Sequence, residues 1–63
     1  MVVNGIEKSI QSQTISELLI SMNLSEASVV VEVNSAIIER ETYAAFQLNG
    51  DDIVEIVGFV GGG

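Results

Sequence analysis

The chain contains no cysteine and no histidine. Without cysteine, neither a disulfide nor a thiolate metal site can hold the fold together. The absence of histidine also excludes the usual general base near neutral pH and a common transition-metal ligand. At 63 residues the chain forms one domain at most, too small to hollow out a deep catalytic pocket. We therefore predict that the chain is not an enzyme and holds no metal.

Basic residues are almost as scarce. Lys8 and Arg40 stand against nine carboxylates, which gives a formal net charge of −7. This balance disfavours nucleic acid and anionic membranes, both of which attract Lys and Arg. It leaves two interpretations open: steering toward a protein partner with a basic surface, or solubility of a small apolar-rich domain.

Long apolar runs and targeting signals are also missing. The N-terminus has no basic region followed by an apolar stretch, and no run is long enough to cross a bilayer. We therefore expect a cytoplasmic protein. Hydrophobic residues still make up 48% of the chain, enough for a packed core.

The N-terminal half predicts a β-hairpin followed by a helix. Asn4-Gly5 after Val2-Val3 is a strong signal for a type I′ turn, with a polar return strand from Ile6 to about Gln11. Thr14 and Glu17 have capping-box spacing at a helix start, and Asn23 is a plausible stop, with Leu24 packed beneath the helix. An apolar stripe follows the cap at helical spacing: Ile15, Leu18, Leu19 and Met22.

The C-terminal half predicts strands. Val29 to Val33 is β-branched and suits a central strand; Asn34-Ser35 is a turn, and Ile37-Ile38 a short returning strand. Ile53 to Val60 reads as the last strand. The remaining assignments are core residues Tyr43, Phe46 and Leu48, a turn from Asn49 to Asp52, and inward-facing Val54 and Ile56 on either side of exposed Glu55. One amphipathic helix with several strands predicts an α+β fold, the helix packed on one face of a mixed sheet.

The most informative feature is the end, Gly61-Gly62-Gly63. Glycines without Cβ atoms can thread a narrow channel and present the terminal carboxylate to another enzyme. That carboxylate is the one distinctive reactive group in the chain. Adenylation by ATP would activate it, and a sulfur nucleophile could then displace AMP. No Gly-rich phosphate-binding loop with a lysine is present, so a partner must bind the ATP.

Several segments resemble the ThiS-type sulfur carriers of thiazole (thiamin) biosynthesis, over essentially the whole chain. Val3 to Gly5 resembles the family's first turn, Thr14 to Leu19 its helix start, and Val31 to Ile38 its central hairpin. The segment from Asp51 to Gly63 is similar to the family's ending, which is its most specific part.

The resemblance implies a ubiquitin-like β-grasp domain over residues 1–60 and a flexible C-terminal glycine tail over residues 61–63. It also implies that a ThiF-type enzyme uses ATP and Mg²⁺ to adenylate the terminal glycine. The glycine becomes a thiocarboxylate, which donates its sulfur to thiazole synthase. Gly63 is then the sulfur attachment point, with Gly61 and Gly62 threading the tail. A free monomer suits a tail that must visit two active sites.

Other functions stay open from the residues alone. A molybdopterin-type sulfur carrier or a ubiquitin-like modifier would use the same tail for another acceptor. A β-grasp interaction module with an inert tail belongs to a different class, because it would bind its partner equally well without the last three residues.

Candidate partner contacts are Phe59, Val57 and Arg40. Phe59 is either an aromatic anchor for a partner or a strand-end residue on its own core. Arg40 could contact a partner or pair locally with an acid such as Glu39, Glu41 or Asp52. The family often carries Pro-Arg and a Trp here, whereas this chain has Glu39, Arg40 and Tyr43.

Overall fold

The computed structural model describes residues 1–9 and 13–58. Five strands form one mixed sheet in the order β2-β1-β7-β4-β5, and β3 and β6 form a separate antiparallel pair. The strands are β1 (Val2–Val3), β2 (Ile6–Glu7), β3 (Gln13–Thr14), β4 (Val29–Val33), β5 (Ala36–Ile38), β6 (Gln47–Leu48) and β7 (Ile53–Gly58). The helices are α1 (Ile15–Ser21) and the short 3₁₀ turns η1 (Glu26–Ser28) and η2 (Arg40–Thr42).

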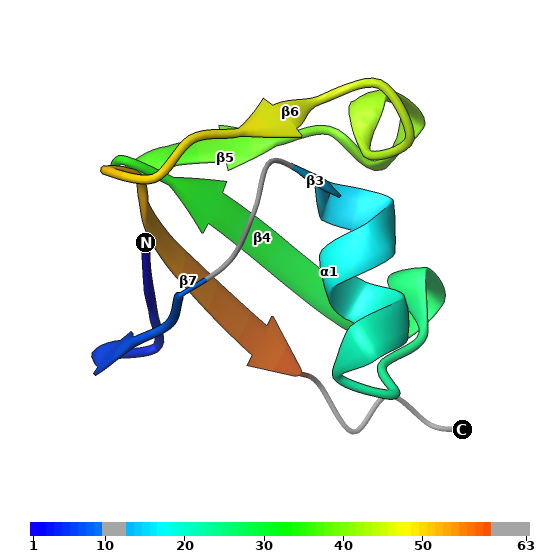
Figure 1. The fold of residues 1–63 in the computed structure, drawn as a ribbon. Helices are drawn as coiled ribbons and strands as arrows, with labels where there is room; N and C mark the ends of the chain where they lie inside the picture. The colour runs from blue at the N-terminus through cyan, green and yellow to red at the C-terminus, as the bar shows by residue number, and fades with distance from the viewer. Residues whose placement is uncertain (10–12, 59–63) are drawn as a thin grey trace.

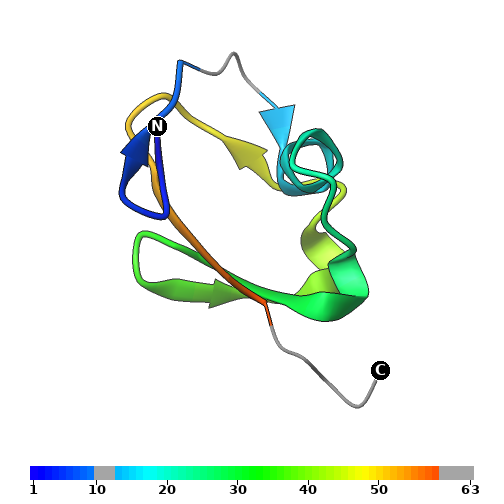
Figure 2. The same ribbon diagram turned by 90° about the horizontal axis from the view of Figure 1, so that it is seen from below.

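The helix α1 covers one side of the sheet (Figure 1). In the perpendicular view α1 is seen nearly end-on, while β7 and β4 run along the other side of the molecule (Figure 2). The core between them is aliphatic apart from Tyr43: Met1, Val3, Ile15, Leu18, Leu19, Val29, Val31, Val33, Tyr43, Leu48, Val54 and Ile56. The predicted α+β architecture is therefore confirmed.

The first hairpin forms where Asn4-Gly5 predicts it. Asn4 has φ 51° and Gly5 has φ 81°, the two positive values that a type I′ turn requires. The Asn4 side-chain Oδ1 accepts a hydrogen bond from Ile56 N at 2.7 Å and so ties the turn to β7. The return strand is shorter than expected, because β2 ends at Glu7. Its predicted end near Gln11 lies outside the described residues.

The helix start also matches its prediction. Thr14 Oγ1 accepts from Glu17 N at 3.1 Å, and Glu17 Oε1 accepts from Thr14 N at 2.8 Å, which completes the capping box. The helix ends with Met22 as its C-cap, and Asn23 follows at φ 60°. Leu24 does not pack beneath the helix as expected, because 37% of it stays exposed.

The pair of β3 and β6 has no counterpart in the sequence prediction. Gln13 pairs with Leu48 and Thr14 with Gln47. The backbone of the 43–46 loop also accepts hydrogen bonds from the first turn of α1, Ile15 N to Phe46 O and Ser16 N to Tyr43 O, both at 3.1 Å. These bonds satisfy amide groups that a helix N-terminus leaves unpaired. The helix start is therefore fixed by a segment about thirty residues away.

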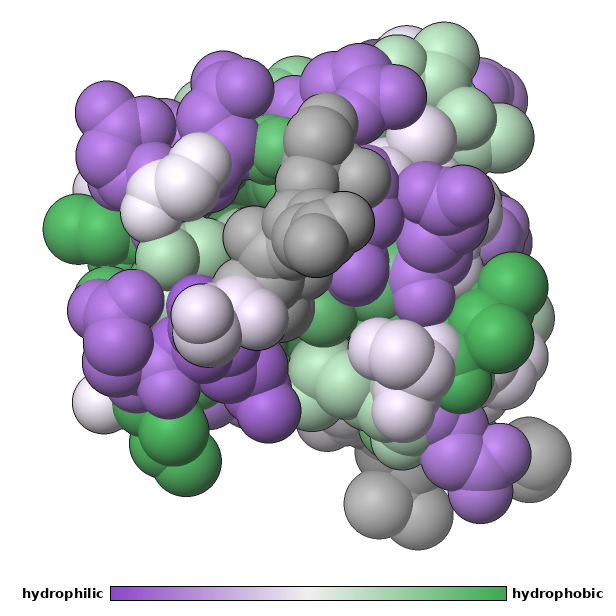
Figure 3. Space-filling view, viewed as in Figure 1, coloured by the Kyte–Doolittle hydropathy of each residue, from purple (hydrophilic) through white to green (hydrophobic). Residues whose placement is uncertain are grey.

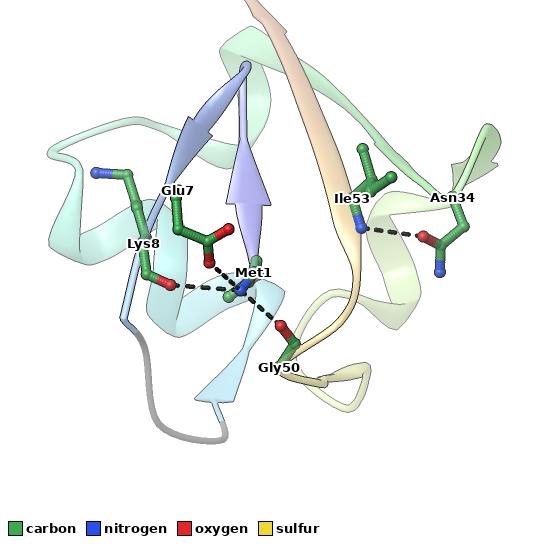
Figure 4. A network of polar contacts seen from close by, with 6 residues as sticks. All are labelled: Met1, Glu7, Lys8, Asn34, Gly50 and Ile53. Carbon is green, nitrogen blue, oxygen red and sulfur yellow. Dashed lines mark hydrogen bonds and ion pairs between the residues drawn. The ribbon is translucent and has the colours of Figure 1, made fainter.

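The N-terminal ammonium lies in a small polar network. It donates to Gly50 O at 2.6 Å, to Glu7 Oε2 at 3.1 Å and to Lys8 O at 3.3 Å (Figure 4). The Met1 side chain is buried beside it. This network joins the first hairpin to the turn before β7.

Within the part of the chain that the structure describes, no helix is long and apolar enough to cross a membrane.

Candidate functional site

The proposed reactive end follows directly from a strand in the middle of the sheet. β7 is described to Gly58, and five residues remain after it in this sequence. Phe59, Gly61, Gly62, Gly63 and the predicted boundary after residue 60 all lie outside the described residues. The predictions for them therefore stay predictions.

Chain geometry limits where a partner can hold this end. Five fully extended residues span at most about 18 Å. An enzyme that acts on the Gly63 carboxylate must therefore contact the molecule close to Gly58. This limit on the reach of the tail selects the end of the sheet where Gly58 of β7 pairs with Val29 of β4.

Val57 lies at that end and points outward, as its alternation with buried Val54 and Ile56 predicts. It is 57% exposed and lies directly opposite Val30 of β4, which is 36% exposed. Next to this pair, Gly58 lies opposite Val29. Among the described residues, an added Cβ at Gly58 would meet only Ser28 O, at 3.9 Å, an ordinary contact distance. The predicted contact residue Val57 is thus available to a partner.

The side of the sheet away from α1 continues this surface. Cross-strand partners share one face, so Glu32, which lies opposite both Glu55 and Ile37, faces the same way as the Val30–Val57 pair. Ile53 joins them by the alternation along β7. We call this set the outer face: Val30, Glu32, Ile37, Ile53, Glu55 and Val57.

The outer face combines four aliphatic side chains with two carboxylates. Ile37, Val57 and Ile53 are 69%, 57% and 54% exposed. The helix side, seen in the space-filling view, shows hydrophilic side chains interspersed with separate apolar groups (Figure 3). The alternation of β4 and β7 in the sequence signals an exposed apolar stripe, but it cannot show that Glu32 and Glu55 meet.

Arg40 lies in η2, between Glu39 and Glu41, and these three residues line an open depression. The expected local ion pair is absent: among the described residues the structure shows one ion pair, between the Met1 ammonium and Glu7. Asp52 is engaged elsewhere, with Asn34 and the Asn49 backbone. Arg40 therefore remains available to a partner.

Tyr43 and Glu39, the two residues that depart from the family pattern, differ in their burial. Tyr43 is only 2% exposed and fills an aromatic core position, as expected for a residue that replaces a Trp. Glu39, at the position where the family often has proline, is exposed and makes no side-chain cap to η2. The departures do not disturb the core.

The predicted turn at Asn49 to Asp52 is confirmed, and its last residue is buried. Asp52 is only 8% exposed, and its carboxylate accepts from Asn49 N at 2.8 Å and from Asn34 Nδ2 at 3.0 Å. It therefore shapes the backbone before β7. No group of three or more acidic, histidine or cysteine side chains that could hold a metal lies within residues 1–9 and 13–58.

Comparison with known proteins identifies the family. The profile of the ThiS family matches residues 1–63. The chain belongs to the ThiS family. The ThiS-family chain also matches the crystal structure of the thiamine biosynthesis protein ThiS from Geobacter metallireducens, with a TM-score of 0.81 and 35% identity over 98% of this chain and 96% of that one. The predicted ubiquitin-like β-grasp fold is thereby confirmed.

Two kinds of curated relative are similar to this ThiS-family chain. The sulfur carrier protein ThiS of Bacillus subtilis is 48% identical over 50 residues, 79% of this chain and 76% of that protein. The thiazole synthase of Paramagnetospirillum magneticum is 38% identical over 64 residues, and this chain spans only 20% of that protein's length. The relatives thus include a separate sulfur carrier protein and much longer thiazole synthases, of which this chain matches one part.

Proposed function

We propose that this ThiS-family chain carries sulfur for thiazole formation as a thiocarboxylate on the carboxyl group of Gly63. One observation carries the proposal. The family match covers the full chain, and the three terminal glycines follow two residues after the last described strand residue, Gly58. The chain itself supplies no cysteine, histidine or described metal cluster for another chemistry.

The chemistry needs two steps on the same carboxyl group. The Gly63 carboxylate attacks the α-phosphorus of ATP and releases pyrophosphate, which leaves an acyl adenylate. A sulfur nucleophile at the oxidation level of sulfide then attacks the acyl carbon, and AMP leaves. The product is a thiocarboxylate, whose sulfur is a better nucleophile than the original carboxylate oxygen and can be transferred onward.

The partner enzymes supply what this chain lacks. A ThiF-type enzyme would bind ATP and Mg²⁺ and adenylate the tail, and thiazole synthase would accept the sulfur. The carrier is thus a protein cosubstrate and not a catalyst. Thiazole synthases that contain a stretch similar to this chain, such as that of Magnetococcus marinus with 42% identity over 50 residues, support the second partner.

Three side chains are the proposed partner contacts. Val57 is exposed beside Gly58, and Arg40 has no ion-pair partner among the described residues. Phe59, an aromatic residue of the kind that dominates interface energetics, follows directly. Val57 and Phe59 would contact the partner next to the tail, and Arg40 would contact it elsewhere on the surface.

The direct test is fragment mass spectrometry of the chain after incubation with ATP, Mg²⁺, a sulfide source and a ThiF-type enzyme. We expect sulfur at Gly63 only when ATP is present. Fragmentation is needed because oxidation of Met1 or Met22 adds nearly the same nominal mass as exchange of oxygen for sulfur. An unmodified tail in the presence of a demonstrably active enzyme would overturn the proposal.

A variant with a shortened tail distinguishes a sulfur carrier from an interaction module. Deletion of Gly62 and Gly63 leaves every described element of the fold in the chain, and the melting temperature of the variant is measured as the control for folding. A carrier would lose sulfur transfer completely, whereas an interaction module with an inert tail would bind its partner unchanged. Transfer from the loaded chain to thiazole synthase, compared with transfer to a molybdopterin synthase subunit, tests the acceptor.

A further inference from the structure

We propose that the outer face is the docking surface for thiazole synthase and that the synthase places a basic side chain between Glu32 and Glu55. This inference rests on the proposed function, which makes the synthase a partner, and adds where it binds and by what chemistry.

The first observation is a like-charge pair with no neutralising group. Glu32 and Glu55 lie directly opposite each other on β4 and β7. Directly opposed like charges destabilise a sheet. Neither carboxylate has an ion-pair partner among the described residues. The only basic side chains of the sequence, Lys8 and Arg40, lie beyond the strands β2 and β5 at the two edges of the sheet. A cation from outside would convert this repulsion into attraction to both carboxylates.

The second observation is the apolar surround of the pair. Along β7, Glu55 lies between Ile53 and Val57, and across the sheet Glu32 lies opposite Ile37. Exposed aliphatic groups around a charged centre exclude water from the interface with a docked partner. A desolvated ion pair in such an interface is stronger than one in open solvent. The arrangement fits a protein surface with one basic side chain ringed by apolar groups. Nucleic acid would meet only repulsion from this acidic centre.

The third observation is position and size. The accessible surface of the chain is 4127 Å², and a stable interface takes about 800 Å² from each partner. A partner therefore has to cover roughly one whole face. The outer face includes Val57, the residue before Gly58, and the end of the chain reaches at most about 18 Å beyond it. A partner seated there can hold the tail at the same time.

Thiazole synthase is the occupant that the relatives favour. In the synthases of P. magneticum and M. marinus, a stretch similar to this chain belongs to the same polypeptide. A covalent link raises the effective concentration of the two parts, so even a weak contact is populated. Without such a link, the same contact depends on the affinity of the surface alone.

The experiment is a charge reversal, Glu55→Lys, with Glu41→Lys as the matched control. Glu41 is exposed on η2 and makes no described ion pair, so its reversal changes the net charge equally. We expect Glu55→Lys to weaken binding to the thiazole synthase of the same organism at least tenfold in isothermal titration calorimetry. The control should weaken it less than threefold. Glu55→Lys should also raise the melting temperature by a few degrees, because it replaces repulsion of Glu32 with attraction.

Three results would overturn the inference. Binding of Glu55→Lys as tight as that of the parent would exclude the outer face. Equal losses of binding affinity for Glu55→Lys and Glu41→Lys would show that the effect comes from net charge alone. Loss of adenylation with unchanged synthase binding would assign the face to the activating enzyme. Sulfur loading at Gly63 of the parent chain is measured in parallel, and its absence would instead overturn the proposed function.

Discussion

The Asn34 side chain donates from Nδ2 to Asp52 Oδ1 at 3.0 Å and joins the turn after β4 to the start of β7. Asn34 Oδ1 also accepts from Ile53 N at 2.9 Å, and the Asn34 backbone N donates to Ile53 O at 2.8 Å. One side chain thus holds the hairpin of β4 and β5 against the strand that leads to the tail. These contacts support the register in which Glu32 opposes Glu55.

Asn34→Ala should lower the free energy of unfolding by about 2–4 kcal/mol, because it removes two hydrogen bonds and strains a left-handed backbone. The backbone at Asn34 has φ 52°, where alanine is disfavoured and glycine is not. Asn34→Gly should therefore cost less. Urea denaturation monitored by circular dichroism measures both. A cost below about 0.5 kcal/mol for Asn34→Ala would show that the link contributes little.

Leu19→Ala should destabilise the chain by about 2–5 kcal/mol, because Leu19 is fully buried beneath the sheet. Its neighbour Ile20 on the same helix is 75% exposed, so Ile20→Ala should change the stability by less than about 0.5 kcal/mol. Comparing the two by thermal denaturation controls for helix propensity. Similar melting temperatures for the two variants would contradict the packing of α1.

Gly5→Ala should cost about 1–2 kcal/mol, because Gly5 has φ 81° in the first hairpin. Space is not the obstacle, since nothing lies within 4 Å of an added Cβ. Gly50 offers a control: an added Cβ there also meets nothing within 4 Å, and its φ is not in the left-handed region. Gly50→Ala should be neutral or slightly stabilising. Equal effects in urea melts would argue against a type I′ turn.

Acetylation of the N-terminus should destabilise the chain by about 1–3 kcal/mol, because it weakens a part-buried set of hydrogen bonds from the ammonium. The bond to Gly50 O, at 2.6 Å, is the shortest of them. The Glu7 side chain is 75% exposed, so Glu7→Gln should cost much less. Calorimetric melting of the acetylated and free chains makes the comparison. An unchanged melting temperature after acetylation would exclude a structural role for the ammonium.

Arg40→Ala should leave the melting temperature within about 2 °C of the parent, because an exposed side chain that has no ion pair with any described residue contributes little. We expect it to slow sulfur loading of the tail several-fold, most strongly at low salt, if Arg40 steers the encounter with the activating enzyme. Arg40→Lys, which keeps the charge, should restore most of the rate. Loading that is identical for all three chains would remove Arg40 from the interface.

Local signals in the sequence predicted most of the elements. The Asn4-Gly5 hairpin and the Thr14–Glu17 capping box both formed as expected, because each depends on residues at most a few positions apart. The alternation of Val54, Ile56 and Val57 correctly separated inward from outward side chains for the same reason. The weak assignments were boundaries, such as the extension of the return strand beyond Glu7, where polar residues carry no clear period.

The candidate site likewise depends partly on the sequence alone and partly on the tertiary structure. The sequence by itself determined the basis of the proposed chemistry: the absence of cysteine and histidine, the acidic charge and the terminal glycines are matters of composition and order. Only the tertiary structure decided that β3 pairs with β6, that Asp52 is buried and that Glu32 opposes Glu55. Those relations join residues distant along the chain, and their register follows from packing the whole sheet against α1. No local pattern specifies it.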